Sequence, residues 1–266
     1  MLRRPLRSGR RREHGRDERA TTPAHGTADG ELAVHRRDRT PRQHRFARNG
    51  ASRRAQPDDR GSGGIAHSEV STPQTRILHG AQLWVALPAS AQDADPAFET
   101  YAPDPVKLDG ATVRVFLGST AGSTSPVRTF TPLLGAEILL EPGADVTLDI
   151  QRGFEVGGVL VDEGEVQLRG TTVRWAELGY QPPGGESLVA LRNTGGTRAR
   201  LLLLGGEPLG EQVIMWWNFL GRSHEDIVGY RREWQSELRG AAPADSRFGT
   251  VEGYDGDPPA RTRTAE

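Results

Sequence analysis

Short stretches of alternating or continuous apolar residues recur along most of the chain, and turn-forming Gly, Pro and Asp residues separate them. This texture is typical of an all-β sandwich or barrel. Three turns are expected at 141–144, at 162–164 as a hairpin tip, and at 182–185. The predicted strands are Gln82–Leu87, Thr112–Leu117, Val127–Pro132, Glu137–Glu141, Val146–Ile150, Phe154–Val161, Glu165–Leu168, Thr172–Glu177, Ser187–Arg192 and Arg198–Leu204.

One helix is predicted, from Ser223 to about Leu238. Ser223 with Asp226 three residues on nearly matches a capping box, and Ile227 and Tyr230 follow at helical intervals. The Pro- and Asp-rich stretch from 89 to 108 indicates a linker, and residues 241–266 indicate a loose tail.

Residues 1–64 lack this apolar periodicity. They hold 17 arginines and 8 acidic residues, a net charge of +9, whereas residues 65–266 hold 17 basic and 27 acidic residues, a net charge of −10. A segment with so few large apolar side chains cannot offset the entropy lost on ordering, so we expect it to be disordered or irregular coil. Lys107 is the single lysine of the chain, which indicates a GC-rich gene.

Composition excludes several classes of protein. The absence of cysteine excludes disulfides and thiolate metal sites, and the longest aliphatic run, Leu201–Leu204, is too short to span a membrane. The N-terminus has arginines but no apolar region after them, which is unlike a secretory signal. We therefore expect a cytoplasmic protein.

Several strings resemble the pirin family of two-domain cupins: GGIAHSE at 63–69, GAQLWVALP at 80–88, SPVRTFTPLL at 125–134, GGEPLGEQVIMWWNFLGRSHEDIVGYRREW at 205–234 and RFG at 247–249. The resemblance implies an all-β double cupin with an incomplete N-terminal barrel. The implied boundaries are an arginine-rich segment at 1–62, a remnant of the N-terminal barrel at 63–88, a linker at 89–108, and the C-terminal barrel with its helix at 109–240.

The resemblance also implies a metal centre in the N-terminal barrel. In that family two histidines of an H-P-H motif and the His and Glu of an H-x-E motif hold iron, a donor set that suits non-haem iron. His67 and Glu69 match the second motif, with Glu69 as metal ligand and catalytic base. The H-P-H motif is missing, and His14, His25, His35 and His44 stand isolated, so two of the four ligands are absent. We expect weak iron binding or none.

A change of reading frame accounts for the gap. With freely chosen codons read one nucleotide later, residues 22–25 give H-P-H, residues 40–44 give H-R-D-S, and residues 51–61 give RPGELSLMTAG, all of them pirin-like and in pirin-like order. We therefore interpret residues 22–61 as a frameshifted form of the N-terminal cupin, with the frame restored near Ser62. A genuine arginine-rich arm is the alternative. If the segment is scrambled, residues 65–87 lose their partner strands.

Other candidate chemistry is weaker. The arginine-rich arm could bind nucleic acid, but its interspersed acids and single aromatic residue, Phe46, argue against it. The C-terminal barrel has no histidine, and its carboxylates Glu155, Asp162, Glu163 and Glu165 indicate no metal. We expect Trp216, Trp217 and Phe219 to pack as core rather than to bind a ligand, and His224 to begin the helix.

The resemblance implies two functions. The first is an iron-dependent quercetin 2,3-dioxygenase that opens a flavonol-like small molecule with O2, impaired in this chain. The second is a non-catalytic regulatory protein that acts on a protein partner, so whether the chain is an enzyme stays open. In either case we expect a monomer that binds neither nucleic acid nor membrane.

Overall fold

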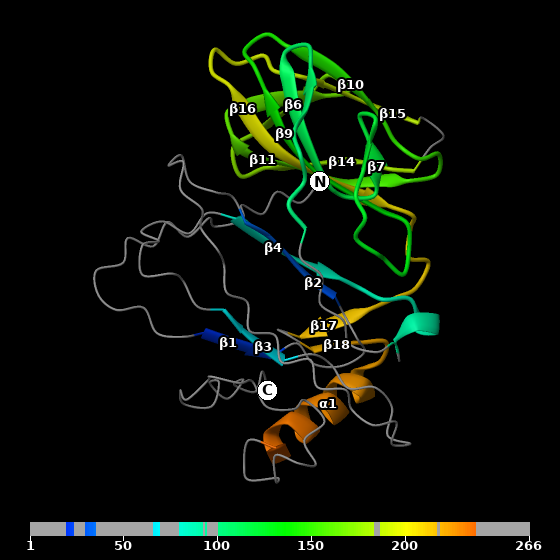
Figure 1. The fold of residues 1–266 in the computed structure, drawn as a ribbon. Coiled ribbons are helices and arrows are strands. Elements are labelled where there is room, and N and C mark those ends of the chain that lie inside the picture. Colours follow the sequence, from blue (N-terminus) through cyan, green and yellow to red (C-terminus); the bar gives the residue numbers. More distant parts are fainter. Residues whose placement is uncertain are drawn as a thin grey trace, which may run out of the picture. The chain divides into compact units, whose positions relative to one another are not determined.

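The computed structural model describes residues 20–23, 30–35, 66–69, 80–92, 94, 101–183, 187–216 and 219–237; for the strands before residue 70 it describes the backbone alone. The chain divides into two compact units. Unit 1 comprises Glu99–Leu209 together with Met1–Arg12, and unit 2 comprises Glu13–Phe98 and Gly210–Glu266. The described part is mostly β with one helix near its C-terminal end, as the apolar pattern predicts (Figure 1).

Unit 1 contains a six-stranded antiparallel sheet in the order β14-β11-β16-β9-β6-β5. Its strands alternate between side chains that face the core and side chains that face outward, as in β9, where Leu134, Ala136 and Ile138 are buried and Glu137 is not. The strands are β5 (Val106–Leu108), β6 (Ala111–Leu117), β9 (Leu133–Leu140), β11 (Glu155–Glu163), β14 (Leu178–Gln181) and β16 (Ala199–Gly206).

A four-stranded antiparallel sheet in the order β10-β15-β12-β13 completes the unit. Its strands are β10 (Asp145–Asp149), β12 (Glu165–Leu168), β13 (Thr171–Arg174) and β15 (Leu188–Arg192). A small ribbon is formed by β7 (Ser119–Thr120) and β8 (Ser123–Thr124). Within the described residues no ladder joins the two larger sheets into a closed barrel.

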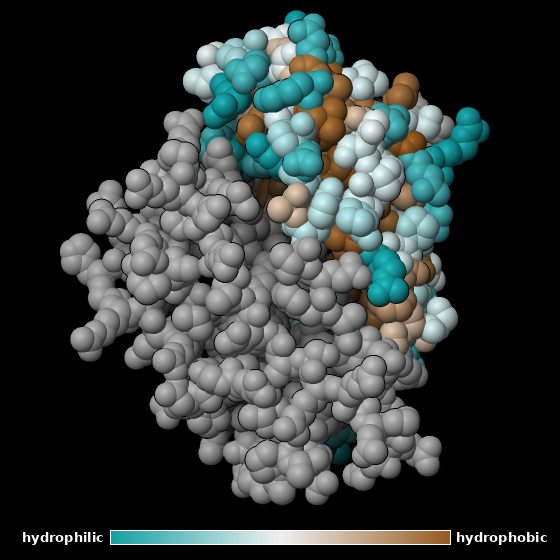
Figure 2. All heavy atoms as spheres, in the orientation of Figure 1, coloured by the Kyte–Doolittle hydropathy of each residue, from teal (hydrophilic) through white to brown (hydrophobic). Residues whose placement is uncertain are grey.

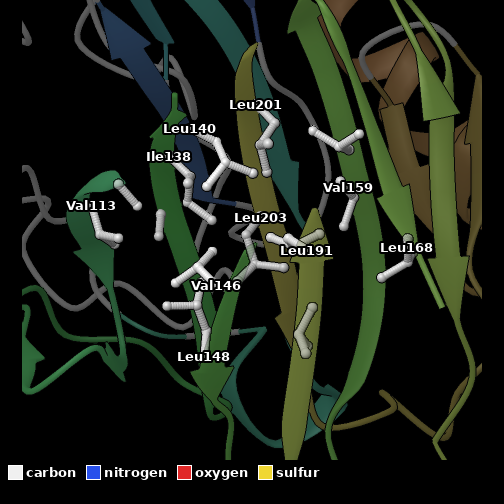
Figure 3. Close-up of a cluster of buried hydrophobic side chains, with 14 of the residues drawn as sticks. Val113, Ile138, Leu140, Val146, Leu148, Val159, Leu168, Leu191, Leu201 and Leu203 are labelled. Atoms are coloured by element: carbon white, nitrogen blue, oxygen red, sulfur yellow. The ribbon is translucent and has the colours of Figure 1, made fainter. Parts of the chain in front are cut away.

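One apolar cluster holds these two sheets together (Figure 3). It combines Ile138 and Leu201 of the larger sheet with Leu148 and Leu191 of the smaller one, and each of these side chains is at most 1% exposed. Burying such side chains contributes about 1.5–3 kcal/mol each. On the side of unit 1 that Figure 2 shows, polar and apolar residues lie side by side on the surface.

The glycine at 164 does not form the tip of a hairpin, contrary to the sequence interpretation. Gly164, at φ +77°, follows β11 directly, but β11 pairs with β14 and β16 whereas β12 pairs with β13 and β15. The residue therefore redirects the chain from one sheet to the other, which a positive φ permits. The turn at 141–144 also links different sheets, and its Ala144 N–H donates to the Glu141 carbonyl over 3.1 Å.

The predicted strand Val127–Pro132 is wrong. These residues form no ladder, and β9 begins only at Leu133. Pro126 and Pro132 lack the N–H groups that pairing needs, which explains why an apolar stretch stays irregular here. In the expected linker, Ala89–Ala91 form a short 3-10 helix and Val106–Leu108 already belong to the sheet of unit 1.

Unit 2 contains two-stranded ladders, β1 (Ala20–Pro23) with β3 (Ala66–Glu69), β2 (Gly30–His35) with β4 (Gly80–Val85), and β17 (Ile214–Trp216) with β18 (Phe219–Gly221). The expectation of coil in the arginine-rich segment is thus wrong for β1 and β2. The expectation that residues 65–87 lack partner strands is wrong for β3 and β4. Leu32 and Val34 in β2 show a two-residue alternation that supports the strand.

Helix α1 (His224–Glu237) confirms the predicted helix and its capping box. The Asp226 N–H donates to Ser223 Oγ over 3.1 Å, and the Ser223 N–H donates to Asp226 Oδ2 over 2.8 Å. Partial burial opposes ionisation of Asp226, but hydrogen bonds from the Ser223 and Arg222 N–H groups outweigh it and lower the pKa. The first turn is therefore closed by a carboxylate.

The helix and the β17–β18 ladder fall in unit 2 with residues 13–98, whereas the predicted boundaries attach them to the C-terminal barrel. The predicted domain boundaries stay a prediction. Among the described residues, none of the helices is long and apolar enough to cross a membrane.

Candidate functional site

The two predicted iron ligands lie on one short strand. His67 and Glu69 belong to β3, two residues apart, so their positions share a face of the strand. Their side chains lie outside what the structure describes, and their roles as ligands and of Glu69 as base stay predictions.

The strand beside β3 comes from the arginine-rich segment. In the β1–β3 ladder Thr22 lies opposite His67, and Ala20 lies opposite Glu69. Directly paired residues of an antiparallel ladder share a face. Position 22 is also where the shifted reading begins its H-P-H motif, so the register puts the first shifted histidine opposite His67.

The four carboxylates of unit 1 that the sequence singles out are engaged with other side chains. Tyr180 donates its hydroxyl to Glu155 over 3.1 Å, a hydrogen bond that, with burial and the nearby charge, raises the pKa of Tyr180. Thr194 donates to Glu165 over 3.2 Å. These pairings account for two of the four carboxylates considered in the sequence.

The other two carboxylates surround Arg200, which is 4% exposed. Its guanidinium lies 3.0 Å from Asp162, 2.9 Å from Glu163 and 3.9 Å from Glu137. Glu137 also pairs with Arg114 over 3.0 Å. This row of charges crosses the outer face of the larger sheet and has the features of a structural ion network.

The interior of unit 1 offers little chemistry. Its core is apolar, and the Oε1 atom of Gln181, a residue 3% exposed, has no hydrogen-bond partner there. In the part of the chain that the structure describes, no three His, Cys, Asp or Glu side chains gather as a metal site would need. One orphan acceptor does not make a ligand site.

Sequence reasoning missed a polar cluster in unit 2, centred on Arg222. The Nε atom of Arg222 donates to Glu211 Oε2 over 2.8 Å, and Nη2 donates to the Leu87 carbonyl over 2.7 Å. Contacts between residues more than 100 positions apart leave no periodic signal. The one local signal in the sequence is that Arg222 directly precedes the helix cap, Ser223.

Of the aromatic residues expected to pack as core, Phe219 is buried, whereas Trp216 is only half-buried. Phe219 is 2% exposed and forms part of the core. The ring of His224, the first residue of α1, meets the ring of Trp216 edge-on with the centroids 4.9 Å apart. The predicted role of His224 as a helix-start residue is confirmed, and Trp217 lies outside the described residues.

A known protein family matches the C-terminal part of the chain. The family described as "Pirin C-terminal cupin domain" matches residues 135–239. The chain belongs to the pirin family. Its matched region runs from strand β9 through helix α1, so it takes in parts of both units.

Curated pirin relatives match a larger part of the chain. A Pseudomonas aeruginosa protein named "Putative quercetin 2,3-dioxygenase" is 36% identical over 195 residues, which are 73% of this chain and 58% of that protein. Human "Pirin" is 33% identical over 174 residues, which are 62% of this chain and 58% of that protein. The chain thus spans less than two thirds of the length of these two relatives.

Solved structures support the cupin fold. A crystal structure named as quercetin 2,3-dioxygenase from Acinetobacter baumannii has a TM-score of 0.64 and 30% identity, and the match covers 77% of this chain and 66% of that one. A second structure of that name and organism, at 19% identity, has a TM-score of 0.61 and covers 84% of this chain and 79% of the other. At that identity the second likeness shows the fold alone.

Proposed function

We propose that this chain is a pirin-family double cupin whose N-terminal barrel has lost half of an iron site and, with it, a quercetin 2,3-dioxygenase activity. The observation that carries the proposal is the H-x-E pair on β3 with Thr22 opposite His67. Similarity to a protein named as a quercetin 2,3-dioxygenase supports the substrate class. The intact family arrangement implies two closed barrels, of which this chain would keep one nearly complete.

His67 and Glu69 alone do not complete an iron centre. His67 and Glu69 offer one imidazole and one carboxylate, and the residue opposite His67 is Thr22, whose hydroxyl is a poor ligand for iron. An open non-haem iron site needs at least three protein donors to hold the metal firmly. No step of a dioxygenase reaction is therefore derived for the chain as it stands.

The experiment compares the chain with a frame-corrected version, in which residues 22–61 are replaced by the shifted reading. Iron content and flavonol consumption are measured on both proteins. We expect the chain to hold iron weakly or not at all and to leave the flavonol unchanged. We expect the corrected version to bind iron stoichiometrically and to consume flavonol, and its Glu69→Ala variant to lose both. Tightly held, stoichiometric iron in the uncorrected chain would overturn the proposal.

A non-catalytic role is the second candidate, favoured by the state of unit 1. Its two sheets and apolar core are complete without the N-terminal segment, so a surface for a protein partner could persist after the metal site is lost. A corrected version that binds iron but does not consume flavonol would favour this candidate.

A further inference from the structure

Arg222 joins three segments of unit 2. Besides the Glu211 carboxylate and the Leu87 carbonyl, its Nη1 atom lies 3.4 Å from Gln92 Oε1. The guanidinium plane lets one side chain make these contacts at once, which a lysine cannot do. Residues 87–92 are thereby held against residues 211 and 222.

Glu211 binds the same segment through its carboxylate. Its Oε1 and Oε2 atoms accept the Ala89 N–H over 3.0 and 3.3 Å, while Oε2 also receives Arg222. The hydrogen bond from Ala89, followed by that from Arg222, lowers the pKa of Glu211. Glu211 and Arg222 together bind two backbone groups, the Ala89 N–H and the Leu87 carbonyl. The two side chains therefore fix the path of the backbone here and not only neighbouring side chains.

The Arg222 cluster lies where the chain of unit 2 is interrupted by residues of unit 1. Unit 2 loses the chain after Phe98 and regains it at Gly210, so residues 99–209 form an insertion within that unit. Leu87, Ala89 and Gln92 lie shortly before the exit, and Glu211 lies directly after the return. The segments that precede and follow the insertion are thus joined within unit 2.

We infer that Glu211 and Arg222 form a latch within unit 2 that holds residues 87–92, which precede the insertion in the chain, against residues that follow it. With the latch intact, residues 87–92 stay bound to the returning chain. With either partner removed, this segment opens while the core of unit 1 remains folded, because its apolar cluster includes no residue of the latch. The inference depends on neither iron nor flavonol binding.

Amide hydrogen exchange of the full chain tests the latch. We expect Glu211→Ala and Arg222→Ala each to speed exchange at Ala89 and its neighbours roughly tenfold, as the loss of charge-assisted hydrogen bonds implies. Amides of β9 and β16 should exchange as before. Glu165→Gln is the matched control, because Glu165 has a similar surface ion pair with Arg174, at 3.8 Å, within unit 1.

The double variant Glu211→Ala with Arg222→Ala decides whether the two residues act together. A latch predicts that the double variant exchanges at Ala89 about as fast as either single variant, since each removal already breaks the pair. Effects that multiply, unchanged exchange at Ala89, or equal acceleration in β9 and β16 would each overturn the inference. Glu211→Gln, which keeps an acceptor for Ala89 but loses the charge, should give a smaller acceleration.

Discussion

Unit 1 and unit 2 differ in how completely their sequences specify a fold. Unit 1 has ten strands in two larger sheets around one apolar cluster, and its charged residues pair across strands. The described strands of unit 2 form two-stranded ladders, of which β17–β18 contacts helix α1. Such ladders are marginal without further packing. Among the described residues, a shared apolar core therefore stabilises the strands of unit 1, whereas the strands of unit 2 are paired two by two.

The largest expected effect is on the core of unit 1. Leu201→Ala should lower the free energy of unfolding of this unit by about 2–5 kcal/mol, because Leu201 is 0% exposed and the change leaves a cavity. Leu83→Ala in β4, whose side chain is only half-buried, is the matched control in unit 2. Urea unfolding followed by circular dichroism measures both. Equal losses would show that the two units are equally well packed.

Arg200 tests the ion network on the outer face of unit 1. Arg200→Ala leaves Asp162 and Glu163 facing each other without their cation, and we expect a loss of about 1–3 kcal/mol, reduced because Glu163 is 49% exposed. Thermal unfolding measures the change. A variant as stable as the parent protein would mean that the desolvation of Arg200 already cancels its ion pairs.

Asn193 probes a buried hydrogen-bond hub in the same unit. Its side-chain amide donates to the Leu140 carbonyl over 2.9 Å and to the Thr197 carbonyl over 2.8 Å, and the residue is 0% exposed. Asn193→Ala should cost about 1–3 kcal/mol, because the Leu140 carbonyl is left without this partner in the interior. A loss below that of Ser223→Ala would contradict the ranking.

The smallest effect concerns the helix of unit 2. Ser223→Ala should cost about 1 kcal/mol of helix stability through the lost cap, visible as faster hydrogen exchange in the first turn of α1. Thr194→Ala, in a loop of unit 1, serves as the control and should leave that exchange unchanged. Protection equal to that of the parent chain would contradict a capping role for the Ser223 hydroxyl.

Acid should weaken the same region of unit 2. The folded pKa values of Glu211 and Asp226 lie below their ordinary values of 4.5 and 3.8. Their stabilisation is therefore complete above those values and is lost as the pH falls through the folded pKa values. Exchange at Ala89 and in the first turn of α1, corrected for the intrinsic rate, should rise only below about pH 4.5. A rise that begins near neutral pH would contradict this assignment.

Local patterns in the sequence predicted much of the fold. Alternating apolar residues located most strands of unit 1, and the Ser223–Asp226 spacing located the helix start, because these signals lie within a few residues. The strand predicted at residues 127–132 is wrong, because a pattern of apolar residues does not account for the N–H groups that Pro126 and Pro132 lack. The turn residues at 162–164 predict a hairpin wrongly, because local turn chemistry does not reveal which sheet the next strand joins.

The candidate site shows the same limit. The H-x-E pair could be read directly from residues 67–69, and the resemblance supplied the missing motif. The latch could not be found, because Arg222 contacts Leu87, and Glu211 contacts Ala89, across the insertion of residues 99–209. Long-range polar contacts need the three-dimensional structure.

The nucleotide sequence across codons 22–61 decides whether this segment is a frameshifted cupin. We expect that reading it one nucleotide later spells H-P-H from codon 22, H-R-D-S from codon 40 and RPGELSLMTAG from codon 51. Codons that do not spell these motifs in the shifted frame would contradict it and would make residues 22–61 a genuine arginine-rich arm.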